Sequence, residues 1–355
     1  MALFRKLMAN DVECSLSGFI VNGFQVHPYY YNCSTISDPF AIGEKRPFLG
    51  IYFIASGLIL MTTYIPCLIV IACSDLMRSS CYKIMMYLGF VDLVCIMVNS
   101  LATGYLGFVG ATFCSYPRAI FVFGSLGCGG WIGACATCIL LAVNRCCDIN
   151  HRIPFREMFR GNTVFILMVI PLVITVYAVF FTKPVLFNSN YMSWFFTPFT
   201  GLELESYVNL AHTTTNCVVS LATTSIYVYL CLFIRHSARH SHSEALSKTQ
   251  KQVLVQSSII CSFNAIAAYI YVYMQFFPAP PLVILIGQIA WQWSHGSVGI
   301  VYITMNKTIR RKVIDLIIPH FIRQRLHIGT FEVISQKTAV SSVRKIATTS
   351  GSSNF

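Results

Sequence analysis

The chain has 355 residues, of which 55% are hydrophobic and 11% are charged, and its formal net charge at pH 7 is +12. The charged share is about half that of a soluble globular domain, so the composition excludes an ordinary soluble module and predicts a membrane protein. A basic chain also suggests nucleic acid as a partner. Here, however, the Lys and Arg residues are dispersed among short connections, which disfavours nucleic acid.

Residues 1–48 precede the first apolar stretch, and we expect them to form an extracellular N-terminal tail. A cleavable signal peptide is not expected, because the first 25 residues contain polar positions such as Asp11 and Glu13 in place of an uninterrupted apolar core. The triplet Asn32-Cys33-Ser34 is a glycosylation sequon. Glycosylation of Asn32 requires this tail to be on the lumenal side of the membrane.

Seven apolar stretches follow, and each is long enough to cross a hydrocarbon layer of ~30 Å at ~1.5 Å per helical residue. They are residues 49–73, 84–109, 119–143, 163–182, 210–234, 253–277 and 282–304. None shows the alternation of a barrel strand, and a helix satisfies its own backbone hydrogen bonds in lipid. The predicted fold class is therefore an all-α membrane protein, with a seven-transmembrane helix bundle over residues 49–304.

The basic residues are distributed unevenly between the two sides of this bundle. Nineteen of the 25 Lys and Arg residues lie in the first, third and fifth connections and in the tail after the last span. Positively charged loops stay on the cytoplasmic side, so the N-terminus is expected outside and the C-terminus in the cytoplasm.

Asp92 is the one acidic residue within the predicted spans, where an ionised carboxylate is costly without partners. At the same depth from the cytoplasmic end, the last span carries Ser294, His295 and Ser297, and Asn99 lies one or two turns above Asp92. These groups are expected to form either a network that rearranges when the bundle changes state or a merely structural hydrogen-bonded cluster.

The third span contains two further features. Cys135 and Cys138 form a Cys-x-x-Cys pair, but no His or second pair accompanies them in this apolar helix, so packing is expected and no metal site. Asn144 and Arg145 stand at the cytoplasmic end of the span. Arg145 is expected either to extend to lipid phosphates or to act as a switch that keeps the cytoplasmic face closed.

Polar and aromatic side chains collect in the outer halves of the last three spans. An aromatic cleft with a few polar groups is typical of a small-molecule pocket. Aromatic belts at the membrane interface have the same composition and remain the alternative interpretation. The candidate ligand-binding residues are His212, Asn216, Tyr269, Tyr273, Gln275, Gln288, Trp291 and Gln292.

After the last span, apolar residues repeat at helical spacing opposite Arg310, Arg311 and Lys312. This pattern predicts an amphipathic interfacial helix over residues 305–326, with membrane lipids as its partner. Residues 327–355 are rich in Ser and Thr and are expected to form a disordered cytoplasmic tail.

Several motifs, specific in combination, resemble one receptor family over about residues 31–311. The motifs are Tyr64-Ile65-Pro66-Cys67-Leu68, Ser80-Cys81-Tyr82-Lys83-Ile84-Met85, Leu88-Gly89-Phe90-Val91-Asp92, Asn99-Ser100, Thr103-Gly104, Phe113-Cys114-Ser115-Tyr116-Pro117 and Leu141-Ala142-Val143-Asn144-Arg145-Cys146. Together with the seven spans, they make the chain similar to the nematode serpentine receptors of class T, which are G-protein-coupled receptors with a rhodopsin-like architecture.

The resemblance implies a chemosensory receptor that passes the signal of a small-molecule ligand to a heterotrimeric G protein. It also implies a location in the plasma membrane, with sensory cilia as the family's expected site. It implies neither catalysis nor a cofactor, and a retinal pigment is disfavoured because residues 282–304 contain no Lys for a Schiff base. Arg145 matches the Arg of the Asp-Arg-Tyr motif, and Asp92 matches the buried acid of the second helix. Of the usual Asn-Pro-x-x-Tyr motif only Tyr302 is carried over.

On this interpretation, activation opens a basic cytoplasmic surface that faces the G protein. Besides Arg145, its expected members are Arg152, Arg156, Arg235, Lys248 and Lys251.

Rhodopsin-like receptors customarily have a disulfide from the start of the third helix to the loop after the fourth. This bridge cannot form here, because the connection between residues 182 and 209 contains no cysteine. We expect Cys114 to pair instead with Cys33, and Cys14 is the competing partner.

A membrane transporter or a ligand-gated channel is the alternative function. Against it, the predicted spans contain one acid, no Lys and no matching pair of broken helices. An odorant-gated channel with seven helices would also have its N-terminus inside. A membrane enzyme is disfavoured because His212 and His295 are each the one His of their span.

Overall fold

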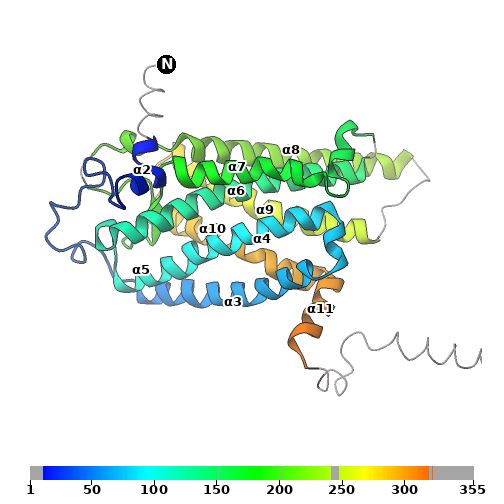
Figure 1. The fold of residues 1–355 in the computed structure, drawn as a ribbon, viewed down its shortest axis with the longest axis horizontal. Helices are drawn as coiled ribbons and strands as arrows, with labels where there is room; N and C mark the ends of the chain where they lie inside the picture. The colour runs from blue at the N-terminus through cyan, green and yellow to red at the C-terminus, as the bar shows by residue number, and fades with distance from the viewer. Residues whose placement is uncertain (1–10, 151, 201, 241–247, 320–321, 323–355) are drawn as a thin grey trace, which may run out of the picture.

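The computed structural model describes residues 11–150, 152–200, 202–240, 248–319 and 322, and in this part of the chain it is a bundle of seven long helices (Figure 1). Every predicted span is confirmed as a helix. The helices are α3 (Pro47–Ala72), α4 (Ser80–Ile96) with its continuation into α5 (Thr103–Val109), α6 (Pro117–Ile149), α7 (Val164–Phe181), α8 (Leu210–His240), α9 (Lys248–Phe276) and α10 (Pro281–Met305).

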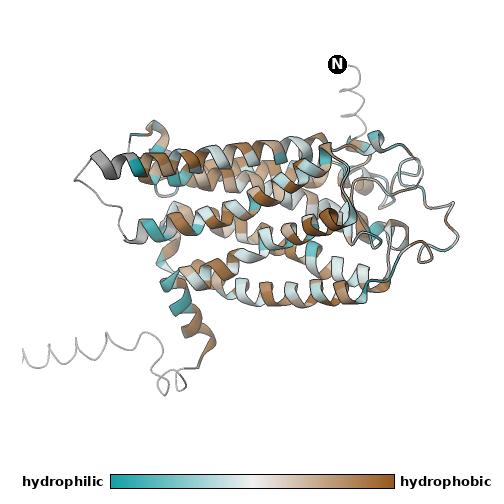
Figure 2. Ribbon diagram, turned by 180° about the vertical axis from the view of Figure 1, so that it is seen from behind, coloured by the Kyte–Doolittle hydropathy of each residue, from teal (hydrophilic) through white to brown (hydrophobic). Residues whose placement is uncertain are grey.

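Six of these helices are long and apolar enough to cross a membrane by length and composition. The exception is α10, which has 25 residues but carries Gln288, Gln292 and His295. All three side chains are buried, so these polar groups face other helices. Intramembrane polar residues are tolerated in such positions, where protein partners replace water. Along the bundle, hydrophobic residues dominate the long helices in Figure 2.

The second span is not a regular α-helix throughout. Between α4 and α5 lies η2 (Met97–Ala102), a stretch of π-helix within the span Ser80–Val109. Such wider turns occur mostly as short interruptions of α-helices and frequently at functional sites. Asn99 and Ser100 in η2 are completely buried, so this irregular turn directs polar groups into the bundle.

One end of the bundle, here called the N-terminal end, is covered by irregular chain (Figure 1). The cover contains the short helix α2 (Leu16–Val21) and a hairpin of β1 (Leu186–Asn188) and β2 (Ser193–Phe195), which pair in antiparallel fashion with Leu186 opposite Phe195.

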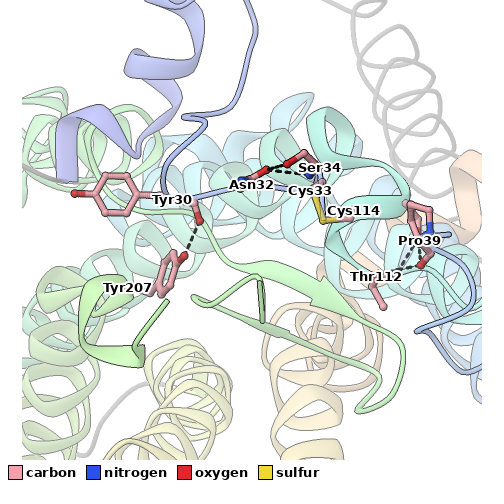
Figure 3. Close-up of a disulfide and its surroundings, with 9 residues drawn as sticks. Tyr30, Asn32, Cys33, Ser34, Pro39, Thr112, Cys114 and Tyr207 are labelled. Atoms are coloured by element: carbon pink, nitrogen blue, oxygen red, sulfur yellow. Dashed lines mark hydrogen bonds between the residues drawn. A yellow bond between two sulfur atoms is a disulfide. The ribbon is translucent and has the colours of Figure 1, made fainter. Parts of the chain in front are cut away.

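A disulfide attaches the N-terminal segment to the bundle. Cys33 is bonded to Cys114, which confirms the expected pairing, whereas Cys14 is free and buried (Figure 3). Close by, the Tyr207 hydroxyl donates a hydrogen bond to the carbonyl oxygen of Tyr30. The segment is therefore held both covalently and by packing.

An ion pair adds a further attachment. The Nζ atom of Lys183 lies 2.9 Å from Oδ1 of Asp11, and the Lys183 side chain is 0% exposed. Burial raises the pKa of the Asp11 carboxyl above its usual range, and the neighbouring Lys183 acts in the opposite direction. A buried Lys requires such a partner, because an unpaired charge away from water is costly.

The opposite end, here called the C-terminal end, carries α11 (Lys307–Ile317), which turns away from the bundle (Figure 1). Asn306 caps this helix, since its side chain accepts from the backbone N–H groups of Thr308 and Ile309. Of the predicted interfacial helix over residues 305–326, the part from residue 323 lies outside the described residues, and so does the predicted tail over residues 327–355.

Candidate functional site

A cavity of about 340 Å³ lies among α6, α8, α9 and α10, next to strand β2. Its walls are mainly aromatic. Seven Phe, Tyr and Trp residues from four different segments line it, namely Trp131, Trp194, Phe195, Phe196, Tyr271, Phe277 and Trp291. The volume and the apolar lining fit a site for a small organic molecule.

Three polar side chains line the same cavity: His212 from α8, Gln275 from α9 and Gln288 from α10. Among the described lining residues there is no Asp, Glu, Lys or Arg. Gln275 is exposed, whereas Gln288 is 1% exposed and lies deep in the bundle. The described lining therefore carries no permanent charge, and His212 is its one residue that can become positively charged.

Half of the eight candidate ligand-binding residues line this cavity: His212, Gln275, Gln288 and Trp291. Two others lie next to it or below it. Asn216 accepts a hydrogen bond of 2.8 Å from the indole of Trp131, which places it behind the cavity wall. Gln292 turns toward α3 and η2, where its amide donates to the hydroxyls of Ser56 and Ser100.

Tyr269 and Tyr273, also predicted as ligand-binding residues, do not line the cavity. Each is 45% exposed, and the Tyr269 hydroxyl donates to the backbone oxygen of Ser220 in α8. They are four residues apart and so share one face of the helix, while Tyr271 between them points to the cavity. The alternative interpretation of aromatic residues at the membrane boundary fits these two positions.

Several cavity residues were not predicted from the sequence. Trp194, Phe195 and Phe196 belong to the connection after α7, where nothing local indicates that the chain folds back over the bundle. Trp131 could have been recognised as a candidate, because it is the one aromatic residue among the glycines of residues 124–133 in α6. Gly127 is one of them, and a Cβ atom there would lie 3.0 Å from the indole of Trp291, so this glycine makes room for the cavity floor.

Below the cavity, Asp92 and His295 form the polar centre of the bundle. Oδ1 of Asp92 lies 2.7 Å from Nδ1 of His295, and Oδ2 accepts a hydrogen bond of 2.7 Å from the Tyr64 hydroxyl. The exposed fractions of Asp92 and His295 are 1% and 0%. Burial of this kind is tolerable because both carboxylate oxygens have partners.

Trp291 connects the cavity to this centre. Its indole N–H donates to Nε2 of His295 over 3.1 Å. An indole nitrogen is only a donor, so Nε2 must be the acceptor and the imidazole proton resides on Nδ1. From there it is donated to Asp92. The chain of hydrogen bonds therefore runs from the cavity floor through His295 to the acid.

The other residues predicted for this network are arranged differently. Asn99 joins it indirectly, because its amide donates to the backbone oxygen of Trp291. Ser294 and Ser297 do not bond to Asp92: the Ser294 hydroxyl donates to the same Trp291 oxygen, and that of Ser297 has no hydrogen-bond partner among the described residues. Tyr302 packs edge-to-face against Tyr64, with ring centroids 5.8 Å apart.

Arg145 lies near the C-terminal end of α6 and is 5% exposed. Its guanidinium forms an ion pair of 2.6 Å with Asp148 and a hydrogen bond with Asn144. Asn144 in turn donates to the Ser80 hydroxyl at the start of α4. Asp148 was not predicted as a partner of Arg145, although an acidic residue three positions after an Arg in a helix can form an ion pair with it.

The five residues predicted to form a basic surface are on the connections and helix ends at the C-terminal end. Arg152, Arg235 and Lys251 are exposed, and Arg156 is half-buried. Lys248 is the first residue of α9, but its side chain lies outside the described residues. Asn32 is exposed at the other end of the bundle.

Comparisons with known proteins agree with this architecture. The sequence model of the family "Serpentine type 7TM GPCR chemoreceptor Srt" matches residues 14–326. Serpentine receptor class T-55 of Caenorhabditis elegans is 30% identical over 293 residues, which are 81% of this chain and 80% of that protein. The crystal structure of squid rhodopsin superposes with a TM-score of 0.58 at 13% identity, covering 88% of this chain and 92% of that one.

The rhodopsin likeness shows the fold, a seven-helix bundle of the G-protein-coupled receptor type. The family match covers most of the chain and includes the cavity, the Asp92 centre and Arg145. The chain is therefore a multi-pass membrane protein that belongs to the serpentine seven-transmembrane G-protein-coupled chemoreceptors of class Srt.

Proposed function

We propose that the protein is a chemosensory receptor that binds a small molecule in the cavity at the N-terminal end and activates a heterotrimeric G protein at the C-terminal end. In this proposal it resides in the plasma membrane, with the N-terminus outside. Membership of the chemoreceptor family supports the general role. The ligand, the G protein and the orientation are the parts that we add.

The observation that carries the proposal is the position of Trp291. Its ring lines the cavity, and its N–H donates to His295, the partner of Asp92. A ligand that moves this ring removes the donor to Nε2 and so disturbs the pair at the centre of the bundle. A ligand shifts an equilibrium only through a difference in its affinity for the two states, and Trp291 supplies a contact that differs between them.

The C-terminal end supplies the element that responds. Arg145 is held by Asp148 and Asn144 in the conformation described. Release of this Arg, together with separation of the helix ends, would add it to a basic surface with Arg152, Arg235 and Lys251, which are already exposed. A basic surface on the receptor attracts a partner protein whose contact surface is acidic.

Three features support the proposed orientation. Nineteen of the 25 Lys and Arg residues fall on the side of the C-terminal tail, which predicts that this side is cytoplasmic. The disulfide between Cys33 and Cys114 lies at the N-terminal end, and disulfides persist in oxidising compartments. Asn32 at the same end is exposed and suited to glycosylation. An epitope at Met1 should therefore be reachable on intact cells.

The test is activation of a G protein by compounds applied to cells that express the receptor. Volatile alcohols, ketones, esters and heterocycles, together with water-soluble acids and amines, are applied while heterotrimer dissociation is recorded. We expect at least one compound to activate the receptor. Ile284→Trp, which fills the cavity, should raise the half-maximal concentration about tenfold or more.

Ile286→Trp is the matched control, because Ile286 lies on the same helix but is 45% exposed. It should leave the response unchanged. Equal responses of the two variants would place the ligand elsewhere, and an epitope at Met1 that is reachable only after permeabilisation would reject the receptor orientation.

A further inference from the structure

Apart from His212 and the exposed amide of Gln275, the N–H and O–H donors of the described cavity walls are committed to partners within the protein. The three indoles of the walls donate within the bundle, Trp131 to Asn216 over 2.8 Å, Trp194 to Thr103 over 2.8 Å and Trp291 to His295 over 3.1 Å. The Gln288 amide donates to the backbone oxygen of Asn99 over 3.1 Å, and the Tyr271 hydroxyl to that of Gly287 over 3.4 Å. A ligand gains no donor from these groups without breaking a bond in the receptor.

His212 is different, and its neighbours define its protonation. The indole of Trp131 is only a donor, so the Asn216 atom that faces it must be Oδ1. The amide nitrogen of Asn216 then points to the imidazole of His212, where it lies 3.3 Å from both ring nitrogens. An N–H group at equal distance from both nitrogens lies over the face of the ring, where an imidazolium would repel it and a neutral imidazole would not.

In a neutral imidazole, one of the two ring nitrogens carries a hydrogen. Among the described side chains, no acceptor lies within hydrogen-bond distance of that N–H, because Asn216 is the one side chain bonded to the ring. The ring itself lines the cavity and is enclosed by Phe196 and Tyr271, with centroid distances of 5.1 and 5.7 Å. A buried donor without an acceptor is costly, and a ligand atom that accepts from it removes this cost.

The lining also excludes charged ligands. No Asp, Glu, Lys or Arg is among the described residues that line the cavity, and the amide N–H of Asn216 against the ring favours a neutral His212. An ionised ligand would lose its hydration in the cavity without gaining a counter-charge. The aromatic rings, by contrast, offer large apolar surfaces to a flat ligand.

We infer that the cavity selects small neutral molecules that combine an apolar body with one hydrogen-bond acceptor, such as a carbonyl oxygen, and that this acceptor binds the free N–H of His212. The inference rests on the proposed function in that the cavity is taken as the ligand site. It adds the chemical class of the ligand and the residue that recognises its polar atom.

The test compares acetophenone with isopropenylbenzene, in which a methylene group replaces the carbonyl oxygen and the shape is kept. Dissociation constants are measured for the detergent-purified full chain by the ligand-dependent rise in its unfolding temperature. A single neutral hydrogen bond predicts about fivefold tighter binding of acetophenone. Benzoate, similar in size but charged, should show no detectable binding.

His212→Phe keeps an aromatic ring and removes the donor. The ratio of the two dissociation constants should fall to about one, while isopropenylbenzene is bound as before, which also shows that the variant is folded. His27→Phe, at a half-exposed position of the N-terminal segment, should retain the wild-type ratio.

Equal affinities in the wild-type protein would overturn the inference, and this comparison requires no variant. The same holds if neither neutral probe binds, if benzoate binds as well as acetophenone, or if His212→Phe keeps the preference. The proposed function can survive each of these results. A charged compound that activates the G protein in a manner abolished by Ile284→Trp would retain the receptor and reject the ligand class.

Discussion

Trp291 and His295 lie one turn apart on α10 and are joined by a hydrogen bond of 3.1 Å between the indole N–H and Nε2. One member of this pair lines the cavity, and the other bonds to Asp92. The spacing of four residues places both side chains on the same face of the helix. A short piece of a single helix thus joins the candidate ligand site to the buried acid.

Replacement of Asp92 by Asn tests the role of this acid. The variant keeps the shape of the side chain but loses the charge-assisted bond to His295, a difference of about 1.5–3 kcal/mol that shifts a two-state equilibrium by about ten- to hundredfold. We expect signalling to be lost while surface expression and ligand binding survive. Loss of expression in place of loss of signalling would indicate a purely structural role.

The ion pair between Arg145 and Asp148 should restrain the receptor in the described conformation. The Asp148 side chain is 38% exposed, so its pair is partly screened and is worth about 0.5–1 kcal/mol. Asp148→Asn is therefore expected to raise basal G-protein activation about two- to fivefold. Asp75→Asn is the matched control, because Asp75 forms an exposed pair with Arg78 at the same helical spacing. An equal rise in both variants would contradict a specific restraint on Arg145.

The disulfide between Cys33 and Cys114 closes a loop with a sequence separation of 81 residues. Its loss by Cys33→Ala is expected to lower the free energy of unfolding by about 2–4 kcal/mol, since the cross-link restricts the unfolded chain. Thermal unfolding of the purified protein measures this. Reductant should lower the unfolding temperature of the wild type but not of Cys33→Ala, and Cys14→Ala, at the free cysteine, should keep the sensitivity to reductant.

The pair of Asp11 and Lys183 offers a double-mutant test of a buried charge. Lys183→Met leaves the carboxylate of Asp11 without its cation and should destabilise the protein by about 3–5 kcal/mol. Asp11→Leu combined with Lys183→Met removes both charges and should recover most of that loss. If the double variant were as unstable as the single one, the loss would come from packing of the Lys stem and not from an uncompensated charge.

The seven helices and their approximate ends could be predicted from the order of the amino acids alone. The predicted stretch of residues 49–73, for example, corresponds to Pro47–Ala72 in the structure. Length and hydropathy of a span are properties of contiguous residues, and a bilayer tolerates few alternatives to a helix. The pairing of Cys33 with Cys114 was also predictable, from the resemblance and from the lack of a cysteine after α7.

Which side chains contact one another depends on how the helices pack in three dimensions. In α9, Tyr269 and Tyr273 are each 45% exposed and lie away from the cavity, whereas Tyr271 lines it, although all three lie within one short stretch. In lipid, the outer face of a helix is as apolar as the inner face, so hydropathy gives little information about rotation about the helix axis. That rotation is fixed by packing against neighbouring helices. For the same reason, three features of the site could not be predicted from the sequence. They are the position of Trp194 over the cavity, the hydrogen bond between Trp291 and His295, and the free N–H of His212.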